Sequence, residues 1–368
     1  MDSITEDVII PRFGRLHQSL FACLLISIFF SVVHSGETLS ISRELHWAVT
    51  AEKFELALER QRAGKKAQRR FPVVLSHGLF VNSVFLNLDE EHSLAEYLAR
   101  QGFDVWNLSL RGSGRSLAPL RGGPAVWSID EMIDQDLPAV VHYIQEETRS
   151  PRLFWAGYEL GGMLLYGYSI RSGGMGLAGA VTIAAPATFT HPQQQVLKKL
   201  LPLADRPFLK SLFLYLNGPL LGRLLIPLAP RIERIFYNPE NMDDEIKSKL
   251  LEQALLEIKP GVLDQLLLMI ARGELVSGSG DYSYRKNLRK LRLPVMFVGG
   301  AADPLAPPDS IEEVYRAVGS VDRSLRIFGR GSKHSTPYGH LDLLAGKKAR
   351  EEVYPAIGNW LKQRDGRG

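Results

Sequence analysis

A buried strand, a glycine-bracketed turn and an apolar helix follow one another within residues 154–168, FWAGYELGGMLLYGY. In the pattern G-x-S-x-G, a nucleophilic serine stands at the apex of such a strained strand-to-helix turn, the nucleophile elbow. Here Gly157 and Gly161 bracket the turn, but the apex residue is Glu159. The stretch is therefore an elbow with unusual chemistry, an elbow that has lost its chemistry, or no elbow.

Length and composition bound the remaining possibilities. The chain has 368 residues, 45% of them hydrophobic, which is enough for one large domain or two modest ones with a sizeable core. Its net charge is only +4, and no basic stripe interleaved with aromatic residues is present, so nucleic acid is not an expected partner. The single cysteine, Cys23, excludes a disulfide framework or a cysteine-based metal site within the chain.

An apolar run, LFACLLISIFFSVV, occupies residues 20–33. It is shorter than the roughly 20 residues that span a bilayer. Arg12 and Arg15 precede it, and the small residues of VVHSG follow it. This arrangement predicts that residues 1–36 are a signal peptide or an N-terminal membrane anchor, and that the protein is exported or membrane-associated through residues 20–33. A buried N-terminal helix is the alternative.

From residue 46 onward, strand-like and helix-like segments alternate. The expected strands cover residues 71–78, 103–112, 152–157, 177–187, 293–303 and 323–330. The expected helices cover residues 93–102, 128–148 and 350–364. Ser128 with Glu131 forms a capping-box pattern, and Pro138 predicts a kink or a break in its helix. Short apolar strands separated by helices predict an α/β domain over residues 37–368, with a mostly parallel sheet covered on both faces.

Residues 188 to about 285 interrupt this alternation. The stretch is rich in leucine, proline and basic residues, and it reads as several helices without strands. Its position between two strands predicts a helical insertion that packs over the sheet as a cap. Such a cap could help to select apolar substrates. A helical elaboration that does not contact the substrate is the alternative.

Three further segments have the order expected of an acyl-transfer site. In LSHGLF, Leu79 follows the end of a strand, where a backbone N–H forms half of an oxyanion hole, and Leu160, after the apex, provides the other half. Asp303 lies just past an apolar strand, and His340 lies on a loop before the last helix. Together with Glu159 these positions follow the chain order nucleophile, acid, histidine.

The segments LSHGLF, GFDVWNLSLRGSGRS, WSIDEMIDQDLPAVVHYI, GYELGGMLLY, GGAADPLAPP and YGHLDLLAG together resemble the α/β-hydrolase superfamily. Within it, they are similar to the acid lipase-like branch and its bacterial esterase relatives. The resemblance covers residues 45 to 364 and implies the α/β-hydrolase fold, hydrolysis of lipid-like carboxylic esters, and Asp303 and His340 as two members of a triad. It implies an apolar ester as substrate or ligand, and neither metal nor cofactor. The departure is Glu159, where the family places serine.

Three hypotheses accommodate a glutamate at the apex. Glu159 is a covalent nucleophile, as the aspartate is in α/β-hydrolases that open epoxides or displace halide. Alternatively, the site is catalytically silent, the protein binds lipid or a partner, and Glu159 pairs with His340, which raises the pKa of the imidazole. In the third hypothesis, the protein is an esterase or lipase whose nucleophile lies elsewhere or whose Glu159 activates water. The sequence leaves all three open.

Overall fold

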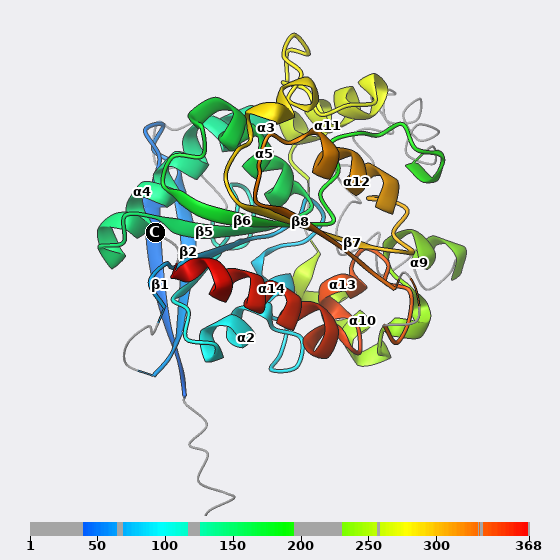
Figure 1. The fold of residues 1–368 in the computed structure, drawn as a ribbon, viewed down its shortest axis with the longest axis horizontal. Helices are drawn as coiled ribbons and strands as arrows, with labels where there is room; N and C mark the ends of the chain where they lie inside the picture. The colour runs from blue at the N-terminus through cyan, green and yellow to red at the C-terminus, as the bar shows by residue number, and fades with distance from the viewer. Residues whose placement is uncertain are drawn as a thin grey trace, which may run out of the picture. The chain divides into compact units, whose positions relative to one another are not determined.

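A sheet of eight strands organises residues 41–368 (Figure 1). The computed structural model describes residues 40–64, 69–116, 126–194, 230–255, 258–329, 331 and 334–366. The strands are β1 (Ile41–Val49), β2 (Glu55–Ala63), β3 (Val73–Ser76), β4 (Val105–Leu108), β5 (Leu153–Tyr158), β6 (Leu177–Ile183), β7 (Val295–Gly300) and β8 (Arg323–Phe328). Their order across the sheet is β1-β2-β4-β3-β5-β6-β7-β8, and only β2 runs antiparallel to its neighbours. The predicted mostly parallel sheet is confirmed.

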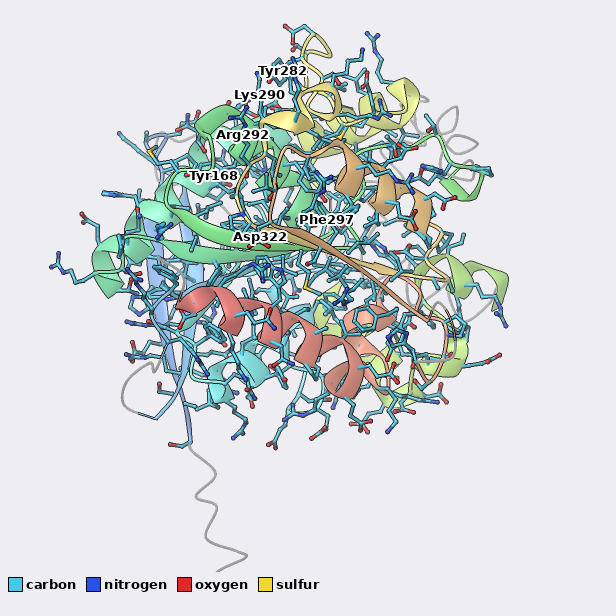
Figure 2. The ribbon with its side chains drawn as sticks, in the orientation of Figure 1. Tyr168, Tyr282, Lys290, Arg292, Phe297 and Asp322 are labelled. Atoms are coloured by element: carbon cyan, nitrogen blue, oxygen red, sulfur yellow. The ribbon has the colours of Figure 1, made fainter. Side chains whose placement is uncertain are left out.

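Helices cover both faces of the sheet. Helices α2 (Leu94–Arg100) and α14 (Ala349–Asp365) lie on one face, and α4 (Leu137–Thr148), α5 (Leu160–Ser172) and α12 (Pro308–Ala317) lie on the other (Figure 1). Because both faces are covered, every residue of β3, β4, β5 and β7 is buried. Phe297, labelled in Figure 2, shows this packing on one face, where its ring lies 6.4 Å from that of Tyr166 in α5 and 6.1 Å from that of Tyr315 in α12.

The antiparallel hairpin of β1 and β2 was not among the expected strands. Its register places Ile41 opposite Ala63. The sequence of β2, ELALERQRA, is too charged to read as an apolar strand. The structure resolves this by pairing charges across the sheet: the Arg60 guanidinium donates to Asp104 at 2.8 and 2.5 Å and lies 4.7 Å from the ring centre of Trp106. A charged strand is thus accommodated by tertiary partners that lie far away in the sequence.

The predicted helix over residues 128–148 forms, with a local widening in place of a break. It begins at α3 (Ile129–Glu131), where the carboxylate of Glu131 accepts the N–H of Ser128 at 2.6 Å, which confirms the capping box. A π-turn, η2 (Met132–Asp136), then leads into α4. Because Pro138 has no N–H and its ring crowds the preceding turn, the helix widens at this point.

The described part of residues 188–285 is helical and contributes no strand to the sheet. Its elements are η3 (Pro192–Gln194), α9 (Pro230–Phe236), η4 (Pro239–Asn241), α10 (Asp244–Lys249), η5 (Leu250–Ala254) and α11 (Pro260–Arg272). The remaining short helices of the chain are η1 (Ser83–Leu86), η6 (Arg285–Lys290) and α13 (Asp342–Ala345). Residues 195–229 lie outside the described residues, and the role of the insertion as a cap remains a prediction.

The insertion is tied to the start of α3 by one carboxylate. Asp130 accepts the hydroxyl of Tyr284 at 2.7 Å, the side-chain amide of Gln265 at 3.1 Å and the N–H of Gly278 at 2.8 Å. Hydrogen bonds to a charged group are among the stronger ones in proteins. The aspartate of WSIDEM therefore has a structural role at the base of the insertion.

Residues 1–36, predicted to be a signal peptide or anchor, lie outside the described residues. Among the residues that are described, no helix combines the length and the apolar character needed to cross a membrane.

Candidate active site

The turn between β5 and α5 has the strained backbone of an elbow. Glu159 adopts φ 47° and ψ −108°, a conformation that costs a non-glycine residue about 1–3 kcal/mol. The strand and helix approach so closely that a Cβ on Gly157 would lie 2.3 Å from the backbone of Gly161, and one on Gly161 would lie 2.4 Å from the carbonyl of Ser76. The bracketing glycines therefore fit the turn because no side chain can.

Asp303 and His340 come together at the ends of neighbouring strands. Asp303 follows β7, and its Oδ1 accepts the N–H groups of Leu305 and Ala306, each at 2.9 Å. Its other oxygen, Oδ2, lies 2.7 Å from Nδ1 of His340. Both side chains are buried. Since an ionised carboxylate only accepts, Nδ1 of His340 is the donor, and Nε2 is directed away from Asp303.

Of the two expected oxyanion donors, Leu79 binds Glu159 directly. The N–H of Leu79 donates to Oε2 of Glu159 at 2.5 Å, and the backbone N–H of Leu160, the next residue, acts to lower the pKa of the same carboxylate. Gly78 lies against the same oxygen, since a Cβ there would be 2.5 Å from Oε2. A carboxylate from the chain itself therefore occupies the position in which the donors would meet a substrate oxygen.

The direct ion pair expected between Glu159 and His340 is not formed. The described contacts of the two side chains include neither a hydrogen bond nor an ion pair between them. Their charges nevertheless interact. Burial raises the pKa of Glu159, against the opposing effects of His340 and of the two backbone donors. Burial alone would lower the pKa of His340, but the charge and hydrogen bond of Asp303, with the charge of Glu159, raise it.

His77 holds the loop that carries Leu79. Its Nδ1 lies 2.8 Å from the carbonyl of Gly78, and its Nε2 accepts the N–H of Leu110 at 3.1 Å and lies 2.9 Å from the hydroxyl of Ser113. Burial lowers the pKa of His77 to about 4, so the imidazole is neutral at pH 7. These contacts make His77 a structural residue of the oxyanion loop.

Tyr158, just before the apex, is a site residue that the sequence did not single out. Its ring lies 5.2 Å from that of His340 and 4.8 Å from that of Phe85. It is buried, and its hydroxyl has no hydrogen-bond partner among the described residues. The sequence indicated a site role for Tyr158 only through its position next to Glu159. That position does not predict that the ring of Tyr158 packs on the imidazole of His340.

A small cavity with a volume of about 20 Å³, close to the room that one water molecule needs, lies beside the elbow. Its apolar lining residues come from the oxyanion loop, the turn after β4, the π-turn, α5 and the insertion: Leu79, Leu110, Met132, Leu160, Ile258 and Val262. Arg111 and Lys259 also line it. The guanidinium of Arg111 is paired with the buried carboxylate of Asp136, with Nε 2.9 Å from both oxygens. In the described part of the chain, no group of three or more His, Cys, Asp or Glu side chains could hold a metal ion.

The sequence matches a known hydrolase family over most of its length. Residues 67–336 match the family described as serine aminopeptidase, S33. The chain belongs to this α/β-hydrolase family. The sheet order, the elbow and the order of Glu159, Asp303 and His340 along the chain agree with that membership.

Relatives of this α/β-hydrolase are lipases. Human lipase member K is 27% identical over 323 residues, which covers 77% of each chain. Triacylglycerol lipase 1 of Arabidopsis thaliana is 23% identical over 84% of each chain. The tear acid lipase-like protein of Mesocricetus auratus is 32% identical, but the match spans only 33% of this chain and 35% of that protein. The chain is therefore lipase- and esterase-like in sequence.

Solved structures share the fold. An esterase from Thermogutta terrifontis aligns with a TM-score of 0.57 and 18% identity over 88% of this chain and 99% of that one. A monoacylglycerol lipase from Paleococcus ferrophilus aligns with a TM-score of 0.54 and 19% identity, over 87% and 99% of the two chains. At this identity the likeness shows the α/β-hydrolase fold.

Proposed function

We propose that this α/β-hydrolase binds an apolar, acyl-type ligand beside its elbow and does not hydrolyse carboxylic esters by serine-type acyl transfer. The observation that carries the proposal is the hydrogen bond from the N–H of Leu79 to the carboxylate of Glu159. Glu159, Asp303 and His340 then form an atypical site in which the apex residue and the oxyanion donors bind each other.

Acyl transfer requires unoccupied hydrogen-bond donors that can bind the negatively charged oxygen of the tetrahedral intermediate. The N–H of Leu79 already binds a carboxylate, so the carbonyl of an ester would have to displace it. Attack by Glu159 itself on an acyl carbon would produce an anhydride. Activation of water by Glu159 would require the same two donors for the substrate. Each route to ester hydrolysis thus conflicts with the position of this one side chain.

The ligand class follows from the pocket and from the relatives. The pocket walls are mostly aliphatic, and apolar burial supplies the affinity of such sites. Relatives that match over most of their length are named as lipases. A fatty-acyl chain suits the aliphatic lining and the relatives, and it requires the cavity, about 20 Å³ in volume, to open on binding.

The test measures binding and turnover on the same sample. The purified chain is titrated with a fluorescent fatty-acid analogue and assayed with p-nitrophenyl esters of several chain lengths. Binding that saturates, without ester turnover above the background rate, is expected. Ester turnover that disappears in His340→Ala would refute the proposal, and so would the lack of any acyl-chain binding.

A second function is favoured by the way Glu159 is held. Only Oε2 accepts the N–H of Leu79, and Asp303 and His340 remain assembled at 2.7 Å. In this candidate, Oε1 attacks a carbon of an epoxide and forms an ester bond while the ring C–O bond breaks, and the alkoxide that leaves takes up a proton. His340 then removes a proton from water, which attacks Cδ of Glu159. The charge that develops on Oε2 faces the N–H of Leu79. The Cδ–Oε1 bond then breaks, the substrate oxygen takes the proton from His340, and a diol is released while the oxygen of the water completes the carboxyl group of Glu159.

Mass spectrometry distinguishes the second function from the first. The chain is incubated with a terminal alkyl epoxide, and His340→Gln is treated in parallel to trap the ester. An adduct of the epoxide's mass on the peptide containing Glu159, accumulating in His340→Gln, supports a carboxylate nucleophile. Unmodified peptide in both samples removes this candidate.

We further propose that residues 1–36 direct export or tether the protein to a membrane. The apolar run at residues 20–33 and the small residues after it support this proposal. Fractionation of cells expressing the full chain tests it, with N-terminal sequencing of the product. An intact chain in the soluble cytoplasmic fraction would contradict it.

A further inference from the structure

The insertion leaves the body of the protein beside the loop that carries Asp303. Gln194, which is 1% exposed, donates its side-chain amide to the carbonyl of Leu305 at 2.9 Å and to that of Thr188 at 3.0 Å. The N–H of the same Leu305 donates to Oδ1 of Asp303. The segment around Leu305 therefore joins the N-terminal end of the insertion (its first foot, residues 188–194) to the carboxylate that binds His340.

The insertion returns beside the loop that carries His340. The carbonyl of Phe236, at the end of α9, accepts the N–H of Leu341 at 2.8 Å. The side-chain amide of Asn238 donates to the carbonyl of Pro337 at 2.8 Å. Residues on both sides of His340 are thus hydrogen-bonded to the second foot of the insertion, by which we mean residues 236–241.

The buried carboxylate of Asp342 lies at the centre of this second foot. Its Oδ1 accepts the N–H of Gly339 at 2.9 Å and that of Asn238 at 3.1 Å, and its Oδ2 accepts the side-chain amide of Asn241 at 2.7 Å. Asp342 is fully buried, so each of these bonds replaces water that it cannot reach. The loop of His340 and the segment around η4 are therefore held by the same charged group.

We propose that Gln194, Asn238 and Asn241 are positioning residues, through which the two feet of the insertion set the contact between His340 and Asp303. The loop of His340 is hydrogen-bonded to the insertion at several points and the loop of Asp303 through Leu305, so a shift of either end of the insertion moves a backbone segment adjacent to the dyad. A ligand or partner that displaces the insertion would consequently reorient the imidazole. This positioning acts whichever ligand or reaction the site serves.

The test follows the Nδ1 proton of His340 by NMR in the full chain. This proton is assigned by its loss in His340→Asn, and its exchange with water is measured in the native chain, in Asn241→Ala and in Gln194→Ala. Losing one buried hydrogen bond is expected to accelerate this exchange about tenfold. The matched control is Asn287→Ala, because Asn287 donates its amide at 2.9 Å to the carbonyl of Ser283, a residue of neither loop. This control should leave the exchange unchanged.

The indole proton of Trp155 separates positioning from global loosening. It is buried and donates to the carbonyl of Gly161 at 3.0 Å. Faster exchange at His340 with unchanged exchange at Trp155 supports the proposal. Unchanged exchange at His340, or equal acceleration at both protons, overturns it. Gln194→Ala removes the hydrogen bond to the loop of Asp303 and leaves the loop of His340 intact. It therefore decides the question if Asn241→Ala does not fold.

Discussion

Asp303 and Glu159 present two carboxylates that are held alike and used differently. Each accepts from the backbone: Asp303 from two N–H groups, and Glu159 from the N–H of Leu79. The donors to Asp303 come from the residues two and three positions after it, and its free oxygen binds His340 at 2.7 Å. The donor to Glu159, Leu79, lies 80 positions away, and Glu159 is not hydrogen-bonded to His340.

The difference shows that a carboxylate bound by its own turn and a carboxylate bound by a distant loop present their oxygens in different ways. A turn that binds its own aspartate presents the second oxygen in a direction set by that turn. The carboxylate of Glu159 instead accepts from Leu79, on a loop that lies far away in the sequence, so its direction is set by a tertiary contact. Variants of each side chain can break or sharpen this contrast.

The largest expected effect is a gain of function. In Glu159→Ser, the N–H groups of Leu79 and Leu160 are released and the apex can attack an acyl carbon. We expect hydrolysis of p-nitrophenyl butyrate to rise about a thousandfold above that of the native chain, in line with the size of oxyanion-hole effects. Addition of His340→Ala should return the rate to the native level. A folded Glu159→Ser protein without esterase activity would contradict the comparison.

Loss of the charge on Asp303 should be the next largest effect. In Asp303→Asn, the carboxylate that raises the pKa of His340 is gone, so this pKa should fall in an NMR titration. Breaking a buried charge pair typically costs about 3 kcal/mol, which urea unfolding can measure. Asp244→Asn, at an exposed position, serves as the control and should change neither quantity. An unchanged pKa of His340 would show that the dyad is not electrostatically coupled.

Gly78→Ala should disturb Glu159 without touching Asp303. Its Cβ would lie 2.5 Å from Oε2 of Glu159 and 2.9 Å from the ring of Tyr158. Overpacking of this kind costs about 2 kcal/mol. Gly366→Ala, where a Cβ meets nothing within 4 Å, is the matched control. Equal unfolding midpoints for the two variants would mean that the carboxylate moves aside freely.

The smallest expected effect is that of Glu159→Gln. The raised pKa of Glu159 means that the folded state binds more protons than the unfolded state as the pH rises above the ordinary value of 4.5. The stability contributed by Glu159 therefore falls as the pH rises through its folded pKa. Glutamine keeps an acceptor for Leu79 and does not titrate, so the variant should gain about 1 kcal/mol over the native chain at neutral pH and little at acid pH. The reverse trend in urea midpoints would contradict the raised pKa.

Much of the fold could be predicted because its signals are local. Apolar strands such as β5 and β7, the capping box of Ser128 and Glu131, and the final helix all depend on neighbouring residues, and they form close to the expected bounds. The hairpin of β1 and β2 escaped prediction because Arg60 is compensated by Asp104, which lies 44 positions away. The sequence contains both residues but no pattern that links them.

The same division applies to the site. From the sequence alone, Gly157 and Gly161 predicted a tight elbow with Glu159 at its apex. The steric exclusion at Gly157 acts within five residues, whereas that at Gly161 comes from Ser76 on the neighbouring strand. The order of Asp303 and His340 followed from family-like motifs. Only the tertiary structure decided that the carboxylate of Glu159 turns to the N–H of Leu79 and not to His340. The direction of a flexible side chain depends on the donors around it, and here the decisive donor comes from a distant loop.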